Sequence, residues 1–114
     1  MSKRPVGFLV EDIWEAIEKV ECYTSNITVK TFLEDSKTAD AVVRNLEIIG
    51  EAARRLPDDF KVEHSEIEWV KIIGLRHRIV HEYFGVDLDI VWRILKNDLP
   101  AFKEKLSSIR EKLQ

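Results

Sequence analysis

The chain has few of the residues that cross-link small folds or interrupt their helices and strands. Of its 114 residues, one is cysteine, three are proline and four are glycine. The single cysteine, Cys22, excludes a disulfide within the chain, so nothing in the sequence argues for an oxidising compartment. The scarcity of glycine and proline favours long uninterrupted elements over a turn-rich fold.

Long hydrophobic runs are also absent. The apolar stretch near the N-terminus ends at Val10, because Glu11 and Asp12 follow it. That stretch is too short for the apolar region of a signal peptide and far too short to span a bilayer. We therefore expect a cytoplasmic protein that makes no use of a membrane.

The sequence further lacks a glycine-rich phosphate loop, internal repeats and low-complexity segments, which argues against a P-loop or dinucleotide-binding fold. It has no excess of positive charge, since the formal net charge is −3. This balance argues against a general nucleic-acid coat protein, and no DNA partner is expected. A local basic cluster remains possible, and the densest one comprises Lys71, Arg76, His77 and Arg78.

What is present indicates helices. Hydrophobic residues make up 45% of the chain, an ordinary fraction for a globular protein. Helix-forming residues fill most polar positions, and no stretch shows sustained apolar and polar alternation. The length suits one domain, so residues 1–114 are predicted to form a single all-α domain.

Apolar periodicity places four main helices. The first is expected from about Val6 to the mid-twenties, followed by a short helical turn through Phe32 and Leu33. The polar run 35–38 can cap a second helix, which should end before Pro57. A polar loop is expected from Pro57 to about Ser65.

The third helix is predicted to start near Ile67 and to stop near Phe84 and Gly85, where glycine can adopt a left-handed cap. Its apolar residues form two stripes, one of Ile72, Leu75 and Ile79 and another of Val70, Ile73 and Val80. A helix that is apolar on two sides is buried on two sides, which in so small a domain indicates a subunit interface.

The fourth helix should be capped by Asp87 and kinked or restarted at Pro100, because proline lacks an N–H and clashes with the preceding turn. The prediction is therefore an antiparallel four-helix bundle with a kinked last helix, which forms a homodimer.

Chemistry concentrates in residues 74–83, which hold Arg76, His77, Arg78, His81 and Tyr83. Cleavage of RNA by its own 2′-hydroxyl needs a base, an acid and a cation beside the phosphorane. Histidine suits the first two roles because its pKa lies near neutrality. Arginine suits the third because its planar fork can hold two phosphate oxygens. No metal or other cofactor is required.

On an ideal helix, Arg76 and His81 would point about 140° apart. The Arg76 side chain could wrap around the helix, the helix could unwind near Gly85, or a partner subunit could supply half of the site. We favour the shared site combined with the wrapped arginine, because this helix already has the pattern of a buried interface.

Each of these residues also has an ordinary structural interpretation. His81 could be a surface or core histidine, and Tyr83 could be a packing residue whose hydroxyl contacts solvent. Arg76 and Arg78 could be solvated or paired with Glu51 or Glu66. His77 and His81 have the i, i+4 spacing of a metal pair, but the helix offers no third ligand.

The segment resembles the signature of the HEPN superfamily, and within it the HepT-like toxins that are paired with minimal nucleotidyltransferase (MNT) antitoxins. That signature is Arg, a polar residue, a short spacer, His, any residue and Tyr, which Arg76, His77, His81 and Tyr83 match without a gap. Residues 40–53 resemble the second-helix block of the family, and residues 86–100 resemble its C-terminal block. Many relatives have Asn in place of His77, so the role of this histidine stays open.

The resemblance implies a dimeric bundle with the two motifs at a cleft, and a metal-independent RNase in a type VII-like toxin–antitoxin pair. Arg76 and His81 would be catalytic and His77 would support them. It also implies that the antitoxin silences the toxin by transferring AMP from ATP to Tyr83. The alternatives are a non-catalytic helical dimer that presents Tyr83 to a nucleotidyltransferase, and a structural dimer with a vestigial site.

Overall fold

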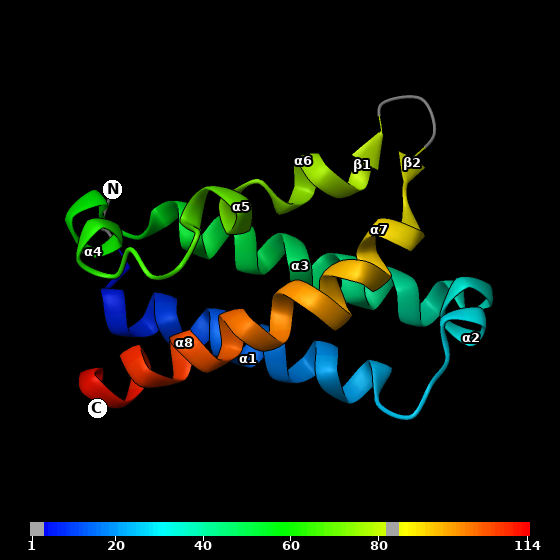
Figure 1. The fold of residues 1–114 in the computed structure, drawn as a ribbon, viewed down its shortest axis with the longest axis horizontal. Helices are drawn as coiled ribbons and strands as arrows, with labels where there is room; N and C mark the ends of the chain where they lie inside the picture. The colour runs from blue at the N-terminus through cyan, green and yellow to red at the C-terminus, as the bar shows by residue number, and fades with distance from the viewer. Residues whose placement is uncertain (1–3, 82–84) are drawn as a thin grey trace.

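The computed structural model describes residues 4–81 and 85–114, except for the side chain of His81. Two long helices dominate it, α1 (Val6–Thr24) and α3 (Ser36–Arg55). They pack against each other along most of their length, and the short α2 (Val29–Glu34) joins them (Figure 1). The first two predicted helices are thus confirmed, with boundaries close to the expected ones.

The polar side chains expected to cap helices do so. The Asp35 carboxylate accepts a hydrogen bond from the N–H of Thr38 at 3.1 Å and begins α3. The Asp87 carboxylate accepts from the N–H groups of Asp89 and Ile90 and begins α7 (Leu88–Arg93). Each carboxylate satisfies N–H groups that have no partner within the helix.

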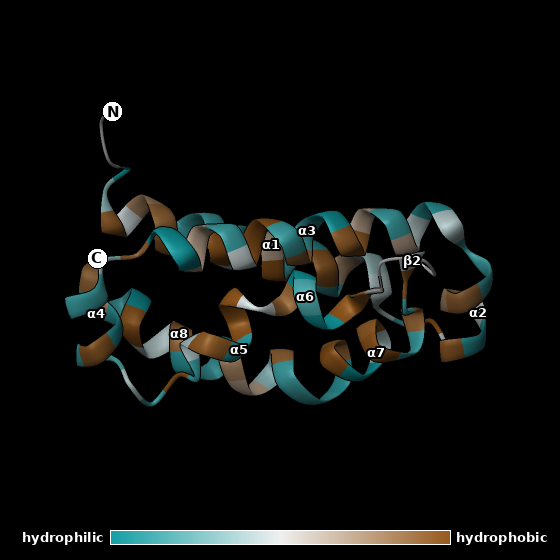
Figure 2. Cartoon of the chain, turned by 90° about the horizontal axis from the view of Figure 1, so that it is seen from above, coloured by the Kyte–Doolittle hydropathy of each residue, from teal (hydrophilic) through white to brown (hydrophobic). Residues whose placement is uncertain are grey.

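The second half of the chain completes the bundle in shorter pieces. After α4 (Asp58–Glu63) come α5 (Trp69–Ile73) and α6 (Leu75–Ile79), which pack on α3. The last arm consists of α7, the π-helix η1 (Ile94–Asp98) and α8 (Leu99–Leu113). Seen from above, α1 and α3 form one layer, α5, α7 and α8 form the other, and α6 lies between them (Figure 2). The result is the predicted antiparallel four-helix bundle with a kinked last helix.

The kink has a clear backbone cause. Pro100 is the second residue of α8, a position where its missing N–H costs nothing. Just before it, the N–H of Leu99 bonds to the carbonyl of Ile94, five residues back, so the helix widens by one residue per turn. The kink predicted at Pro100 is therefore taken up by the π-helical turn that precedes it.

Two predictions about the middle of the chain are wrong. Residues 57–65 are not simply a loop, because α4 forms there, with the pair of carboxylates Asp58 and Asp59 in its first turn. The third helix does not continue to Phe84 and Gly85. It is interrupted at Gly74 and ends at Ile79, and two short antiparallel strands follow, β1 (Val80–His81) and β2 (Gly85–Val86).

The core lies between the two layers, and among the described residues its buried side chains are apolar except for Thr24 and Asn45. All three tryptophans contribute to packing. Trp69 is buried, while Trp14 and Trp92 are partly buried against the core and have cationic side chains over their rings. Packing, rather than an open platform for bases, is therefore the role that the structure assigns to them. Within the described ranges, no helix is long and apolar enough to cross a membrane.

The segment that carries the chemistry is set on α3 through a close approach at Gly50. A Cβ atom there would lie 3.2 Å from the carbonyl oxygen of Ile72 and 3.5 Å from that of Ile73. Both carbonyls belong to the backbone of α5, which cannot move aside as a flexible side chain could. A Cβ atom at this position would therefore push the α5 backbone away from α3 by a few tenths of an ångström.

Gly50→Val should lower the free energy of unfolding by about 2 kcal/mol, because the added methyl groups would push α5 off α3. Gly7→Val is the matched control, since nothing lies within 4 Å of a Cβ at Gly7, and its effect should stay within about 0.5 kcal/mol. Urea unfolding followed by circular dichroism measures both. Equal stabilities of the two variants would contradict the close approach.

Candidate active site

The end of α6 governs where the chemically interesting residues lie. Val80 has φ −103° and ψ 124°, so the backbone leaves the helix directly after Ile79. The N–H of Asp87 donates to the carbonyl of Ile79 at 2.7 Å, which satisfies a helix-end carbonyl from outside the helix. Pairing of Val80 with Val86 and of His81 with Gly85 continues this contact. Gly85 has φ +72°, as expected for the one residue type that adopts this conformation freely.

This helix end changes the geometry anticipated from an ideal helix. Arg76 is on α6, whereas His81 is on β1, so the angle of about 140° between them does not apply. The chain does unwind, but at Val80 rather than near Gly85. Val80 is β-branched and is therefore suited to the strand that replaces the last turns of the predicted helix.

Arg76 and His77 are both exposed on α6. Within the described part of the chain, the Arg76 side chain makes no hydrogen bond or ion pair. The structure therefore excludes pairing of Arg76 with Glu51 in the free chain. Instead, Glu51 accepts two hydrogen bonds from the Arg54 guanidinium, which hold the pKa of its carboxyl below the usual range.

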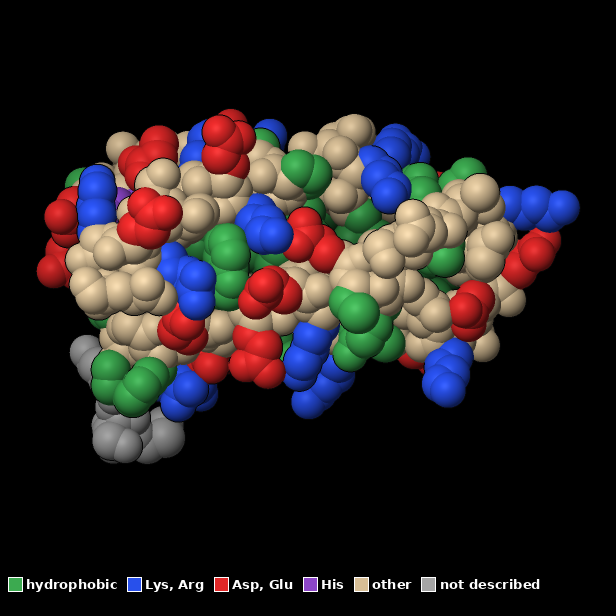
Figure 3. Space-filling view, turned by 90° about the horizontal axis from the view of Figure 1, so that it is seen from below, with side chains coloured by type: hydrophobic (Ala, Val, Ile, Leu, Met, Phe, Trp, Pro, Cys, Tyr) green, Lys and Arg blue, Asp and Glu red, His purple; other side chains and the backbone are tan. Residues whose placement is uncertain are grey.

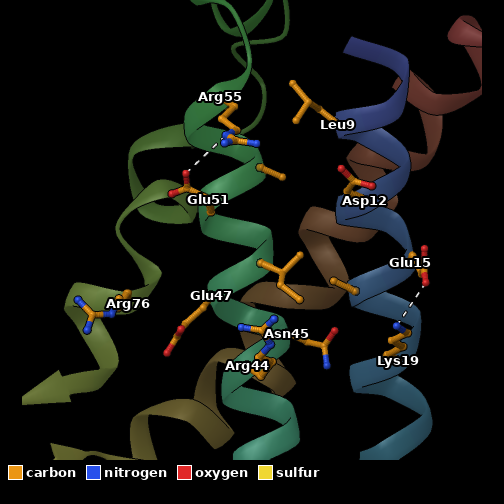
Figure 4. Close-up of a pocket in the computed structure, with 13 residues that line it drawn as sticks. Leu9, Asp12, Glu15, Lys19, Arg44, Asn45, Glu47, Glu51, Arg55 and Arg76 are labelled. Carbon is orange, nitrogen blue, oxygen red and sulfur yellow. Dashed lines mark ion pairs between the residues drawn. The ribbon is translucent and has the colours of Figure 1, made fainter. Parts of the chain in front are cut away.

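Arg76 lines one edge of a hollow of about 530 Å³ over the outer surface of α1 and α3. In Figure 4, α3 runs between α1 and α6, and Arg76 projects from the α6 side. The hollow is mixed in charge, because its rim holds four cationic and four acidic side chains, namely Lys19, Arg44, Arg55, Arg76, Asp12, Glu15, Glu47 and Glu51.

Arg78 has a different environment from Arg76. Its Nη2 donates to the Oδ2 of Asp98 at 2.8 Å, which ties α6 to the last residue of η1. Its Nη1 is buried and has no hydrogen-bond partner among the described residues. Arg78 is thus paired with an acidic residue, but the partner is Asp98 rather than Glu51 or Glu66.

The second apolar stripe of the predicted third helix is only partly covered. The first stripe, of Ile72, Leu75 and Ile79, is buried in the core. In the second, Ile73 and Val80 are partly buried against the core, whereas Val70 is 86% exposed. The chain alone therefore leaves part of this helix without a partner.

Two of the predicted site residues cannot be placed relative to the others. The backbone of His81 is described, but its side chain is not, and Tyr83 lies outside the described residues. The structure thus brings Arg76 and His77 together on one short helix and leaves the approach of His81 to Arg76 as a prediction. In the described residues, no three acidic, histidine or cysteine side chains converge as metal ligands would.

Sequence reasoning missed Asp98 and Arg44. Asp98 lies in the C-terminal block of the family pattern, twenty residues from its partner, so only the fold reveals the contact. Arg44 lies in the second-helix block and lines the same hollow as Arg76. One more arginine on the polar face of α3 does not by itself indicate that it lies beside the same hollow as Arg76.

The structure is thus a small helical bundle with Arg76 and His77 exposed on α6, ahead of a short strand pair. The sequence matches the family described as ribonuclease HepT-like over residues 13–109. The chain therefore belongs to the HepT-like ribonuclease family, and the resemblance found in the sequence is confirmed.

Named relatives cover the chain almost completely. A protein of Thermococcus cleftensis named "Probable ribonuclease HepT" is 46% identical over 109 residues, which is 96% of this chain and 99% of the relative. Proteins of Methanocaldococcus jannaschii and Caldanaerobacter subterraneus, both provisionally named RNases, are 37% and 38% identical, with 100% and 97% of their lengths covered. No solved structure is significantly similar to the chain.

The Arg78–Asp98 contact makes a stability prediction. Asp98→Asn should lower the free energy of unfolding by about 1 kcal/mol, because it leaves a guanidinium that already has one buried, unpartnered nitrogen without its counter-charge. Glu21→Gln is the control, since it removes the similarly exposed Lys103–Glu21 pair and should cost less than about 0.5 kcal/mol. Thermal unfolding at low and high salt compares the two. A larger loss for Glu21→Gln would refute the special dependence of Arg78 on Asp98.

Proposed function

We propose that this protein is a metal-independent endoribonuclease toxin whose site is formed around Arg76 and His81 in a homodimer. The observation that carries the proposal is Arg76 itself. It is exposed at the edge of a hollow, has no acidic partner in the described residues, and lies on α6 just ahead of the strand that bears His81. Membership of a family whose relatives are named ribonucleases supports the same activity.

The proposed chemistry is attack of the ribose 2′-oxygen on the adjacent phosphorus. His81 removes the 2′-hydroxyl proton, the bond to the 5′-oxygen breaks, and an imidazolium returns a proton to that oxygen. The Arg76 guanidinium binds the non-bridging oxygens as their negative charge grows. The products are a 2′,3′-cyclic phosphate and a 5′-hydroxyl. In this proposal His77, which is exposed beside Arg76, would support the phosphate or the leaving group.

A homodimer would explain two features of the isolated chain. Val70 is highly exposed although it belongs to an apolar stripe. In addition, Arg76 and His81 lie on elements of different direction, α6 and β1. A two-fold axis near α6 would place the two copies of the motif across one cleft, so that Arg76 of one subunit could act with His81 of the other.

The RNA would be held locally. The face of the molecule in Figure 3, which is seen from below and so lies away from α6, has acidic and basic side chains intermixed, with no broad area of positive charge. The net charge of −3 has the same implication. Affinity must then come from a few phosphate contacts near α6 rather than from a long electrostatic track.

Control of the toxin is proposed to act on Tyr83, two residues after His81. An MNT-type antitoxin would transfer AMP from ATP, with attack of the phenol oxygen on the α-phosphorus and release of pyrophosphate. The added group would bring bulk and negative charge close to the motif that must bind an RNA phosphate. Such a modification would block substrate through repulsion as well as sterically.

His81→Ala should abolish cleavage of total cellular RNA in EDTA, at least about a hundredfold, because general acid–base catalysis by histidine is lost. His64→Gln is the matched control, since His64 lies outside the motif, directly after α4, with its ring tilted against that of Phe60 at a centroid distance of 4.6 Å. That variant should keep full activity and give products that end in cyclic phosphate and 5′-hydroxyl.

Circular dichroism checks that both variants are folded, and mass spectrometry checks that Tyr83 carries no AMP in the preparation. Full activity of a folded His81→Ala protein would refute the assignment of His81. An unmodified wild type that does not cut RNA would instead favour the alternative function, a non-catalytic partner and AMP acceptor of a nucleotidyltransferase.

A further inference from the structure

Two hollows adjoin each other along α3. The first, described above, is lined by residues of α1 and α3 and by Arg76 of α6. The second, of about 440 Å³, is lined by residues of α3 together with Val86 of β2 and Leu88 at the start of α7. Arg44 and Glu47 line both hollows. The surface of α3 at these two residues therefore connects the Arg76 side of the motif with its strand side.

Charge pairing sets Arg44 apart from most of its neighbours. In the first hollow, Lys19 is 3.3 Å from a carboxylate oxygen of Glu15, and Arg55 is 3.6 Å from one of Glu51. Arg44 and Arg76 have no ion pair or hydrogen bond within residues 4–81 and 85–114. Both are exposed. These two guanidinium groups are consequently the cations of this hollow that are free to bind an anion.

Arg44 also lies where an RNA strand would continue beyond the motif. Val86, in the second hollow, pairs with Val80, the residue before His81. A strand that presents one phosphate to Arg76 and its ribose to the β1 segment would thus run beside α3. Arg44 lies on the surface of α3 that lines both hollows, and in Figure 4 its side chain lies over this helix.

We propose that Arg44 binds a phosphate of the RNA strand next to the one held by Arg76, so that α3 forms a second wall of the substrate site. This inference rests on the proposed ribonuclease function. The guanidinium would donate to phosphate oxygens as Arg76 does, but outside the reacting group, so Arg44 is a substrate-binding residue rather than a catalytic one.

Glu47 opposes the binding of phosphate on this surface of α3. It lies three residues after Arg44, its side chain extends on the α6 side of α3 (Figure 4), and it makes no ion pair or hydrogen bond among the described residues. A carboxylate at this point weakens the binding of a phosphate to either guanidinium. Removal of its charge by Glu47→Gln should therefore tighten RNA binding, opposite to the effect of removing Arg44.

The test measures binding of a fluorescent single-stranded RNA, fully 2′-O-methylated so that it cannot be cleaved, to the complete chain by anisotropy over a range of KCl. Arg44→Ala should weaken binding about tenfold, the loss of one charged hydrogen-bonded contact. The slope of log Kd against log salt should fall by about 0.7, the value for one phosphate of a single strand.

Arg93→Ala is the matched control. Arg93 is an exposed arginine on α7 that lines neither hollow, and its removal changes the net charge equally. It should change Kd by less than about twofold. Equal effects of Arg44→Ala and Arg93→Ala, or no RNA binding by the wild type, would overturn the proposal.

Sedimentation of Arg44→Ala distinguishes a second possibility. Weaker RNA binding that accompanies loss of the wild-type oligomer would make Arg44 a subunit contact and would also overturn the proposal. Weaker binding by an unchanged oligomer supports it. If wild-type protein binds the methylated RNA through Arg44 but does not cut unmodified RNA, the inference stands and the proposed ribonuclease function fails.

Discussion

The end of α6 is the constraint on which the candidate site depends. The hydrogen bond from Asp87 to the Ile79 carbonyl and the Arg78–Asp98 ion pair hold this short helix from two directions. A helix of five residues has too little internal hydrogen bonding to fix its own end, so these outside contacts decide where the backbone turns into β1. Arg76 and His81 consequently lie on different elements, although only four residues lie between them in the sequence.

The rest of the bundle supplies a rigid base for this short segment. The long helices α1 and α3 supply the core residues from the first half of the chain. Gly50 allows α5 to approach the α3 backbone closely. The π-helical turn before Pro100 widens the last arm and ends at Asp98, the residue that holds Arg78. The turn that precedes Pro100 and Arg78, an arginine two residues after the motif arginine, are thus joined at one contact. π-helical turns are frequent at functional sites, and here the turn positions a side chain beside the candidate motif.

The fold was largely predictable because its main signals are local. Periodic apolar positions gave α1 and α3, and the carboxylates of Asp35 and Asp87 marked the helix starts where they cap them. The early end of α6 was not predictable from periodicity, since Val80 continues an apolar stripe equally well as a strand residue. Arg76 was identified from its residue type and the family pattern. Arg44 was not, because its relation to Arg76 arises only when α6 packs on α3, and that packing has no local signature.

The most direct test of the shared site is complementation between two inactive variants. Arg76→Ala and His81→Ala proteins are denatured together, refolded as a mixture and assayed on RNA in EDTA. If each site takes Arg76 from one subunit and His81 from the other, mixed dimers keep one intact site, and the mixture should regain up to about a quarter of wild-type activity. An active wild type whose two variants remain inert after mixing, with mixed dimers verified by mass, would show that each subunit acts alone and would contradict the account.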